Sequence, residues 1–309
     1  MANKKVVIHL SGGLGNQLFQ FMAGFGLAAE VGKKLEINTN WFENPRFRHK
    51  RNIVYLSKRK LDILQFDSVA TTPREALRTP SDGKFERVLS QFGEDSKRKV
   101  GIGSEISFNQ LGWKDPQSIR RLVGHFMSPK YFLKSTTDGL FSKLVEPPSN
   151  WGLELSNKIE LNPSIGVHIR LGDYINLGDK VIPSESYFIS GVNHLKICHG
   201  NTVKVFLFSD DPEQLRIMFP KLCALGEVIS PPRDSSPVEN LILLAKCSSF
   251  VCANSTFSWW GAELSRTSKE MIVRPSYFYT AQPDLDVTAD LWHVSSQRVH
   301  PITGAVVLK

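Results

Sequence analysis

Short apolar runs followed by a turn and an amphipathic segment recur at both ends of the chain. In the first, Val6–Leu10 has the length of a buried strand, residues 11–17 are glycine-rich, and residues 35–38 return as a strand. The segment between them has apolar residues at helical spacing: Leu18, Phe21, Met22, Phe25, Ala28 and Ala29. This strand–helix–strand unit predicts a parallel sheet covered by helices, hence the α/β class.

The second half repeats this alternation. Residues 165–170 and 203–208 read as strands, and Ser184 is a good N-cap for a helix that continues to about residue 196. The other expected elements are helices at 212–219, 238–247 and 257–264 and strands at 249–253 and 271–273. Residues 41–118 are too irregular to order, and helical character is expected again at 119–126.

A proline-containing break at residues 146–150 divides the chain into two expected domains, 1–150 and 151–309. Two βαβ domains predict a ligand in the crevice between them, beyond the carboxyl ends of the strands.

Composition narrows the class of protein. The 309 residues are 41% hydrophobic and 22% charged, which is ordinary for a globular protein and argues against a disordered chain. No run of about 18 apolar residues is present, and the N-terminus lacks the layout of a signal peptide. We therefore expect a cytoplasmic protein.

Positive charge is concentrated in the first half. Residues 1–150 hold 24 Lys and Arg against 14 Asp and Glu, whereas the whole chain has a net charge of +8. Residues 44–61 contain no acid and seven of these cations: Arg46, Arg48, Lys50, Arg51, Lys58, Arg59 and Lys60. A solvated loop is the simplest interpretation, and contact with an anionic membrane surface or ligand is the sharper one. No nucleic-acid recognition signature accompanies the stretch, so no nucleic-acid partner is expected.

The four cysteines lie in the second half, and none forms a C-x-x-C pair. In a cytosolic protein they are expected to be small buried hydrophobic residues without disulfides. The cluster of His194, Cys198 and His199 is the nearest approach to a zinc site, and we interpret it as structural, with no metal expected.

The turn with Gly12, Gly13, Gly15, Asn16 and Gln17 lies between a strand and a helix. Glycines there let the backbone approach a ligand, and the helix N-terminus favours an anion. The turn lacks the third glycine of G-x-G-x-x-G, which weakens an NAD(P)-dependent oxidoreductase as an alternative.

A second group of polar residues follows the strand at 165–170. His168 and Arg170 alternate, so they share one side of the strand, and Asp173 follows. The guanidinium suits a phosphate, although an internal ion pair that holds the loop is an equally good interpretation.

Two more strands end in polar residues. Ser209–Pro212 reads as a helix cap, and its acids, Asp210 and Asp211, could instead accept from a guanine edge or a ribose. Asn254–Ser258 opens a helix, where its hydroxyl and N–H groups can cap the helix or hold a diphosphate.

Together these segments resemble the bacterial-type α-1,2-fucosyltransferases, glycosyltransferase family 11. The matching motifs, in the family's order, are SGGLGNQLFQ (11–20), VHIRLGDY (167–174), FSDDP (208–212) and ANSTFSWWGA (253–262). Residues 122–132 resemble a further region of that family, and the resemblance covers about residues 5–275.

The resemblance implies a GT-B-like fold and a metal-independent, inverting transfer of L-fucose from GDP-fucose to the 2-hydroxyl of a terminal galactose, in cell-surface polysaccharide or O-antigen assembly. It implies no cofactor. Arg170 would stabilise the β-phosphate of the leaving group, with His168 and Asn16 near the donor. The other donor-binding residues would be Gly13, Gly15, Asp210, Asp211, Asn254, Ser255, Thr256, Phe257 and Ser258.

Three residues depart from the family's pattern. Leu171 stands where a second arginine is usual, and His125 and Met127 replace a tyrosine and a glutamine. Leu171 makes a non-catalytic or differently specific GDP-sugar-binding protein the alternative, although its place on the strand also suits a core residue. Asp173 is the candidate general base, with Asp179 as second choice.

Overall fold

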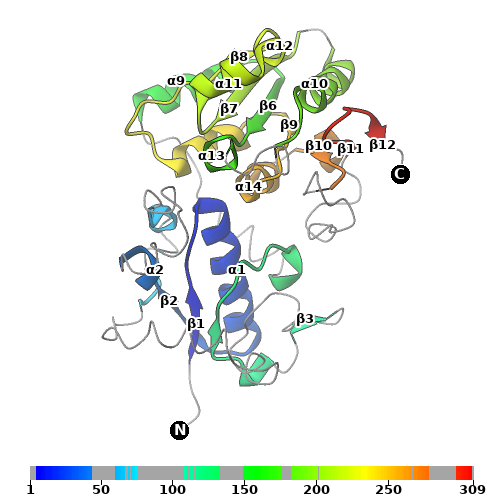
Figure 1. Cartoon of the computed structure of the whole chain (residues 1–309). Coiled ribbons are helices and arrows are strands. Elements are labelled where there is room, and N and C mark those ends of the chain that lie inside the picture. Colours follow the sequence, from blue (N-terminus) through cyan, green and yellow to red (C-terminus); the bar gives the residue numbers. More distant parts are fainter. Residues whose placement is uncertain are drawn as a thin grey trace. The chain divides into compact units, whose positions relative to one another are not determined.

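The computed structural model describes residues 5–43, 60–66, 69, 71–74, 108–109, 112–113, 116–132, 149–175, 182–200, 202–265, 267–277 and 297–307. The chain divides into two compact units, Met1–Lys143 and Leu144–Lys309 (Figure 1). The basic stretch at 46–59 and Asp179 lie outside the described residues.

The first unit is built on a small parallel sheet. Its three strands are β1 (Lys5–His9), β2 (Lys34–Asn38) and β5 (Arg121–Leu122), in the order β2-β1-β5. The 17-residue helix α1 (Leu14–Glu30) connects β1 to β2, as the apolar spacing predicts, although Phe25 and Ala29 are exposed rather than part of its buried side. Shorter elements complete the described part: α2 (Asn40–Glu43), η2 (Asp62–Gln65), the antiparallel pair β3 (Phe108–Asn109) and β4 (Gly112–Trp113), η3 (Pro116–Ser118) and η4 (Pro129–Tyr131).

The helical character expected at residues 119–126 is wrong. Arg121 and Leu122 pair with Val7 and Ile8 of β1, and the Val7 amide donates to the Arg120 carbonyl at 2.9 Å. Phe126 then adopts a φ of 51°, outside the helical region. Pairing with an open edge of β1 outweighs the local helical pattern.

The second unit contains a seven-stranded sheet in the order β12-β11-β10-β9-β6-β7-β8, parallel except for β11 and β12. The strands are β6 (Ser164–Ile169), β7 (Lys204–Ser209), β8 (Glu227–Val228), β9 (Ser249–Val251), β10 (Ile272–Pro275), β11 (Gln297–Val299) and β12 (Val306–Val307). The helices are α9 (Asn150–Glu160), α10 (Glu185–His199), α11 (Pro212–Met218), α12 (Pro220–Cys223), α13 (Pro237–Ala245), α14 (Thr256–Leu264) and η6 (Lys269–Met271). The predicted α/β class is confirmed.

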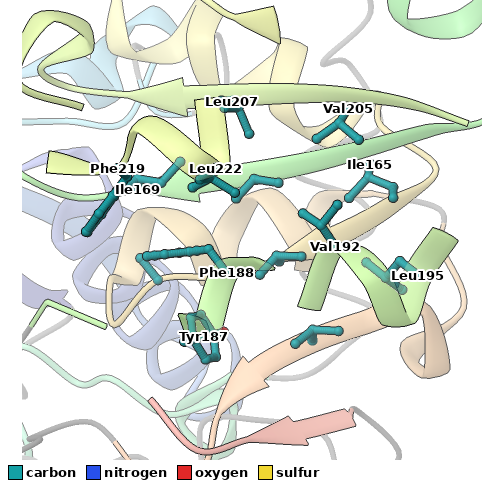
Figure 2. Packing of buried hydrophobic residues seen from close by; sticks show 14 of the residues in the cluster. Ile165, Ile169, Tyr187, Phe188, Val192, Leu195, Val205, Leu207, Phe219 and Leu222 are labelled. Atoms are coloured by element: carbon teal, nitrogen blue, oxygen red, sulfur yellow. The ribbon is translucent and has the colours of Figure 1, made fainter. Parts of the chain in front are cut away.

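Alternate residues of β6 face two different layers of helices. Ile165, Val167 and Ile169 lie in the core with residues of α10 and α12, among them Phe188 and Leu222 (Figure 2). Gly166 faces the opposite side, where an added Cβ would lie 2.9 Å from the Cys247 sulfur and 3.0 Å from a methyl of Leu244 in α13. The strand therefore places His168 on the same side as α13 and α14.

The helix starts follow the predicted capping chemistry. The Ser184 hydroxyl accepts from the Tyr187 amide at 3.2 Å, and the Asp211 carboxylate accepts from the Gln214 amide at 3.0 Å, with Pro212 in the first turn. These caps fix where α10 and α11 begin relative to β6 and β7.

Two of the four cysteines are buried, as expected, and the other two are not. Cys247 and Cys252 are buried, and burial raises the pKa of both thiols well above the ordinary range. Cys198 is exposed and Cys223 is half-buried. Cys198 follows the exposed Ile197 in the last turn of α10, on the side of the helix that faces away from the core.

Candidate active site

The carboxyl end of β6 carries a guanidinium held between carboxylates. Arg170 Nη1 lies 2.7 Å from the Asp210 Oδ2 atom, and Arg170 Nη2 forms an ion pair with Asp173 Oδ1. The guanidinium also lies over the Tyr174 ring, 5.6 Å from its centroid. The Arg170 side chain is only 15% exposed, so these contacts define its position.

Two opposing effects act on the Arg170 pKa. Burial lowers it, because the charged form loses hydration, but Asp210 and Asp173 outweigh that effect and raise the pKa above its ordinary value. Arg170 is a permanent cation. Two carboxylates beside one guanidinium leave the cluster with an excess negative charge, so an entering phosphate must compete with one of them.

Asp210, at the end of β7, contacts the backbone as well as Arg170. Its Oδ1 accepts from the Leu171 amide at 2.8 Å while Oδ2 pairs with the guanidinium. The two carboxyl oxygens therefore point at the turn after β6.

The neighbouring His168 is buried, with 6% of its surface exposed. Its Nδ1 lies 2.6 Å from the Ser258 hydroxyl, and its ring stacks on Phe257 with 5.0 Å between centroids. Burial, together with the charge of Arg170, lowers the pKa of His168 to about 3. The imidazole is therefore neutral at physiological pH and connects β6 to the first turn of α14.

The start of α14 is a compact polar segment. Ser255 caps the helix, because its hydroxyl accepts from the Phe257 amide at 3.2 Å. Ser258 accepts from the Ala253 amide at 3.1 Å and is buried with Asn254, whereas Thr256 and Phe257 are half-buried. In this structure the hydroxyls of Ser255 and Ser258 shape the helix start.

A pocket of about 400 Å³ opens beside the end of β7. Asp210, Asp211, Arg216 and Ser230 are among its lining residues, and Arg216 donates to the Ser230 hydroxyl at 3.2 Å. Its walls combine carboxylates, a guanidinium and a hydroxyl. These groups suit a ligand that both donates and accepts hydrogen bonds.

The glycine-rich turn of the first unit leads into the start of α1. Gly12 has a φ of 76°, Gly13 is the N-cap position of α1, and Gly15 is buried in the first turn. An added Cβ at Gly12 would lie 2.9 Å from the side-chain nitrogen Nδ2 of Asn16, so the glycine leaves room for that side chain.

Gln17 and Gln20 are buried in the same helix. Gln17 Nε2 donates to the carbonyls of Gly12 (3.0 Å) and Lys60 (2.9 Å), and its Oε1 accepts from the Ile63 amide at 3.1 Å. Gln20 Oε1 accepts from the Ser11 amide at 2.8 Å. The sequence singled out Gln17 but not Gln20, although both amides hold the turn.

Glu239 is a second residue that the sequence analysis missed. It is 2% exposed and accepts from the hydroxyls of Ser149 (2.5 Å) and Ser235 (3.0 Å). The signal was present, because Ser236 and Glu239 have the spacing of a capping box at the start of α13. The glutamate joins the start of α9 to that of α13.

The departure at Leu171 has a structural explanation. Its side chain is fully buried in the core cluster that contains Ile169 and Phe188, as its place on the strand suggested. His125, another departure, is exposed and precedes the buried Phe126.

Neither a metal cluster nor a membrane-spanning helix is found in the described parts of the chain. No group of three His, Cys, Asp or Glu side chains there is arranged to hold a metal ion. His199, from the cluster considered above, lies 3.0 Å from the Ser249 hydroxyl. Within the same residues, no helix has the length and apolar character needed to cross a membrane.

Comparison with known proteins finds two relatives that are named as glycosyltransferases. An α-1,2-colitosyltransferase of Escherichia coli is 26% identical over 284 residues, which is 89% of this chain and 92% of that protein. The O-antigen biosynthesis glycosyltransferase WbnK of Escherichia coli is 27% identical over 112 residues, 36% of each chain.

Among solved structures, the fucosyltransferase NodZ from Bradyrhizobium is similar with a TM-score of 0.48 and 15% identity, over 86% of this chain and 94% of that one. The family model of Glycosyl transferase family 11 matches residues 122–282, just over half of the chain and including the Arg170 cluster and α14. The chain is a glycosyltransferase that belongs to Glycosyl transferase family 11.

Proposed function

We propose that this chain transfers L-fucose from GDP-fucose to the 2-hydroxyl of a terminal galactose, with inversion at the anomeric carbon and without a divalent metal. The observation that carries the proposal is the fixed guanidinium of Arg170 at the carboxyl end of β6, the central strand of β9-β6-β7. Ligands of open α/β sheets bind at this edge.

The proposed reaction separates charge, and Arg170 addresses that charge directly. As the C–O bond to the sugar breaks, the departing GDP gains negative charge while the sugar ring becomes positive. A preorganised cation that meets this developing anion lowers the barrier, and removal of one such group costs about 10²–10³ in rate. The start of α14, which His168 holds through Ser258, adds the positive end of a helix dipole.

Asp173 is proposed as the base that takes the proton of the attacking hydroxyl. In the structure it is paired with Arg170. A phosphate that binds the guanidinium competes for the same N–H donors, so donor binding releases the carboxylate for the acceptor. Asp173→Asn is expected to abolish transfer while leaving the affinity for GDP-fucose within about threefold.

The pocket beside β7 is the proposed nucleoside site. The carboxylate of Asp211, which lines this pocket, can accept hydrogen bonds from the N–H groups on the edge of a guanine base. Uracil has a different arrangement of N–H groups. Gly13, Gly15 and Asn16 are proposed donor contacts on the strength of the family motif. Asn16→Ala is expected to weaken donor binding.

The proposal predicts a direct binding result. GDP-fucose titrated into the protein in the presence of EDTA should bind saturably in the micromolar range, with NAD as the negative control. Arg170→Ala should lose at least two decades of transfer rate with a galactoside acceptor. Absence of GDP-fucose and GDP binding would refute the donor class, and near-normal turnover of Arg170→Ala would remove its role at the phosphate.

One finding favours a second candidate for the sugar. The relative that matches along 89% of this chain is named for transfer of colitose. Comparison of GDP-fucose with GDP-colitose in the same transfer assay decides between them. Binding of either donor without transfer to any galactoside would instead support the non-catalytic alternative.

We also propose that the basic stretch at residues 44–61 contacts an anionic membrane surface. Salt-sensitive binding of the protein to anionic vesicles would support this contact.

A further inference from the structure

Asp210 is fixed at two points that belong to the turn after β6. Its Oδ1 accepts from the Leu171 amide at 2.8 Å, and its Oδ2 lies 2.7 Å from Arg170 Nη1. The carboxylate thus joins the end of β7 to the backbone and the side chain of consecutive residues in the neighbouring turn. One of these two partners is a backbone N–H group, whose position does not depend on the Arg170 side chain.

Gly172 provides the space for this arrangement. A Cβ built on Gly172 would lie 2.3 Å from Asp210 Oδ2, closer than Cβ atoms approach other heavy atoms in proteins, and 3.2 Å from its carboxyl carbon, which is a tight contact. Its backbone is not in the left-handed region, so the requirement for glycine here concerns space. Any side chain at position 172 must displace the Asp210 carboxylate.

We propose that Asp210 is a positioning residue that acts through Arg170 and does not read the nucleotide base. The inference rests on the proposed function, because it concerns the group that meets the leaving phosphate. A flexible arginine must be held in one place before it can stabilise an anion efficiently, and a misplacement of about 1 Å can cost about 10²-fold in rate. A carboxylate that also accepted from guanine would have to share oxygens that already face the Leu171 amide and the Arg170 guanidinium.

The two roles predict opposite kinetic changes. In Asp210→Asn the amide can still accept from the Leu171 N–H group, but its charge pairing with Arg170 is lost. We expect kcat for transfer from GDP-fucose to fall by about 10²-fold, while the Kd for GDP stays within about threefold of the wild-type value. Asp211→Asn, which retains the cap of α11, is expected to raise the Kd for GDP and to change kcat less.

The matched control is Glu227→Gln, which removes an exposed acid that pairs with Lys158. It should leave both constants unchanged. The positioning role is overturned if Asp210→Asn raises the Kd for GDP more than tenfold with kcat preserved, because that pattern belongs to a direct nucleotide contact.

A second test needs no ligand. Gly172→Ala should lower the thermal midpoint of the wild-type protein by several degrees, and it should lower the midpoint of Asp210→Ala much less, because the oxygen that the new methyl meets is then gone. Equal shifts in the two backgrounds would overturn the geometry. Failure of the wild-type protein to bind GDP would refute the proposed function instead, and the unfolding cycle would still decide whether Asp210 and Gly172 are coupled.

Discussion

Leu171 offers a quantitative test of the interpretation that this position belongs to the core and not to the donor site. Its side chain is fully buried among Ile169, Phe188 and other apolar residues. Truncation of a buried leucine to alanine costs about 2–5 kcal/mol, because the transfer free energy of the lost methyl groups and the cost of a cavity add. A value of about 3 kcal/mol is therefore expected for Leu171→Ala.

The assay is urea unfolding followed by tryptophan fluorescence, since Trp259 and Trp260 are buried in the same unit. With a slope of about 2 kcal/mol per molar urea, the expected loss shifts the midpoint by about 1.5 M. Leu171→Met, which conserves volume, should cost less than about 1.5 kcal/mol. The affinity for GDP should be unchanged in both variants.

Leu171→Arg provides the decisive comparison, because it introduces the second arginine that the family's motif usually has. From this backbone the new charge would enter the apolar core without a partner, so we expect loss of the folded protein. A Leu171→Arg variant that folds with nearly wild-type stability and binds GDP more tightly would refute the reasoning, since the side chain at 171 would then face the donor.

Further outcomes are expected from the remaining contacts. The pKa of His168 is about 3 in the folded protein and 6.5 when unperturbed. The contribution of the neutral imidazole to the free energy of unfolding is therefore complete above pH 6.5 and is lost as the pH falls toward 3. At pH 5 the loss is about 2 kcal/mol. His168→Asn should remove this part of the pH dependence of unfolding, and His194→Asn should not. Ser258→Ala, which removes the bonds to His168 and to the Ala253 amide, should cost about 2 kcal/mol and weaken donor binding. Gln17→Leu should destabilise the first unit by about 1–3 kcal/mol and increase proteolysis near residues 60–63, as limited digestion would show; an unchanged digestion pattern would count against the role of its amide.

Elements with local signals were predictable from the sequence. Ser184 and Asp211 cap α10 and α11 as their residue types suggest, and β6, β7 and β9 follow apolar runs. The strand at Arg121–Leu122 was not predictable in this way, because its conformation depends on pairing with β1, more than 110 residues earlier. The short strands β11 and β12 were not predicted either, and they pair with β10 and with each other.

The candidate site was predictable as a set of residue types but not as a set of contacts. His168, Arg170, Asp210 and Ser258 stand out because each lies near the end of a strand or in the first turn of a helix. Nothing local shows that Asp210 would turn to the Leu171 amide, 39 residues away, or that Ser258 would reach His168, 90 residues away. These partners follow from the order of strands in the sheet, which a single sequence does not specify.

The close approach of Gly172 to Asp210 has a consequence for how such proteins diverge. A side chain at position 172 and a carboxylate in this orientation at position 210 exclude each other. A lineage that gains a larger residue at the first position must lose or redirect the acid at the second, and the order of the two changes matters, because the intermediate with both groups is strained. Substitutions at these two sites should therefore be inherited as a pair, and a library that randomises them together will recover folded combinations that single-site libraries miss.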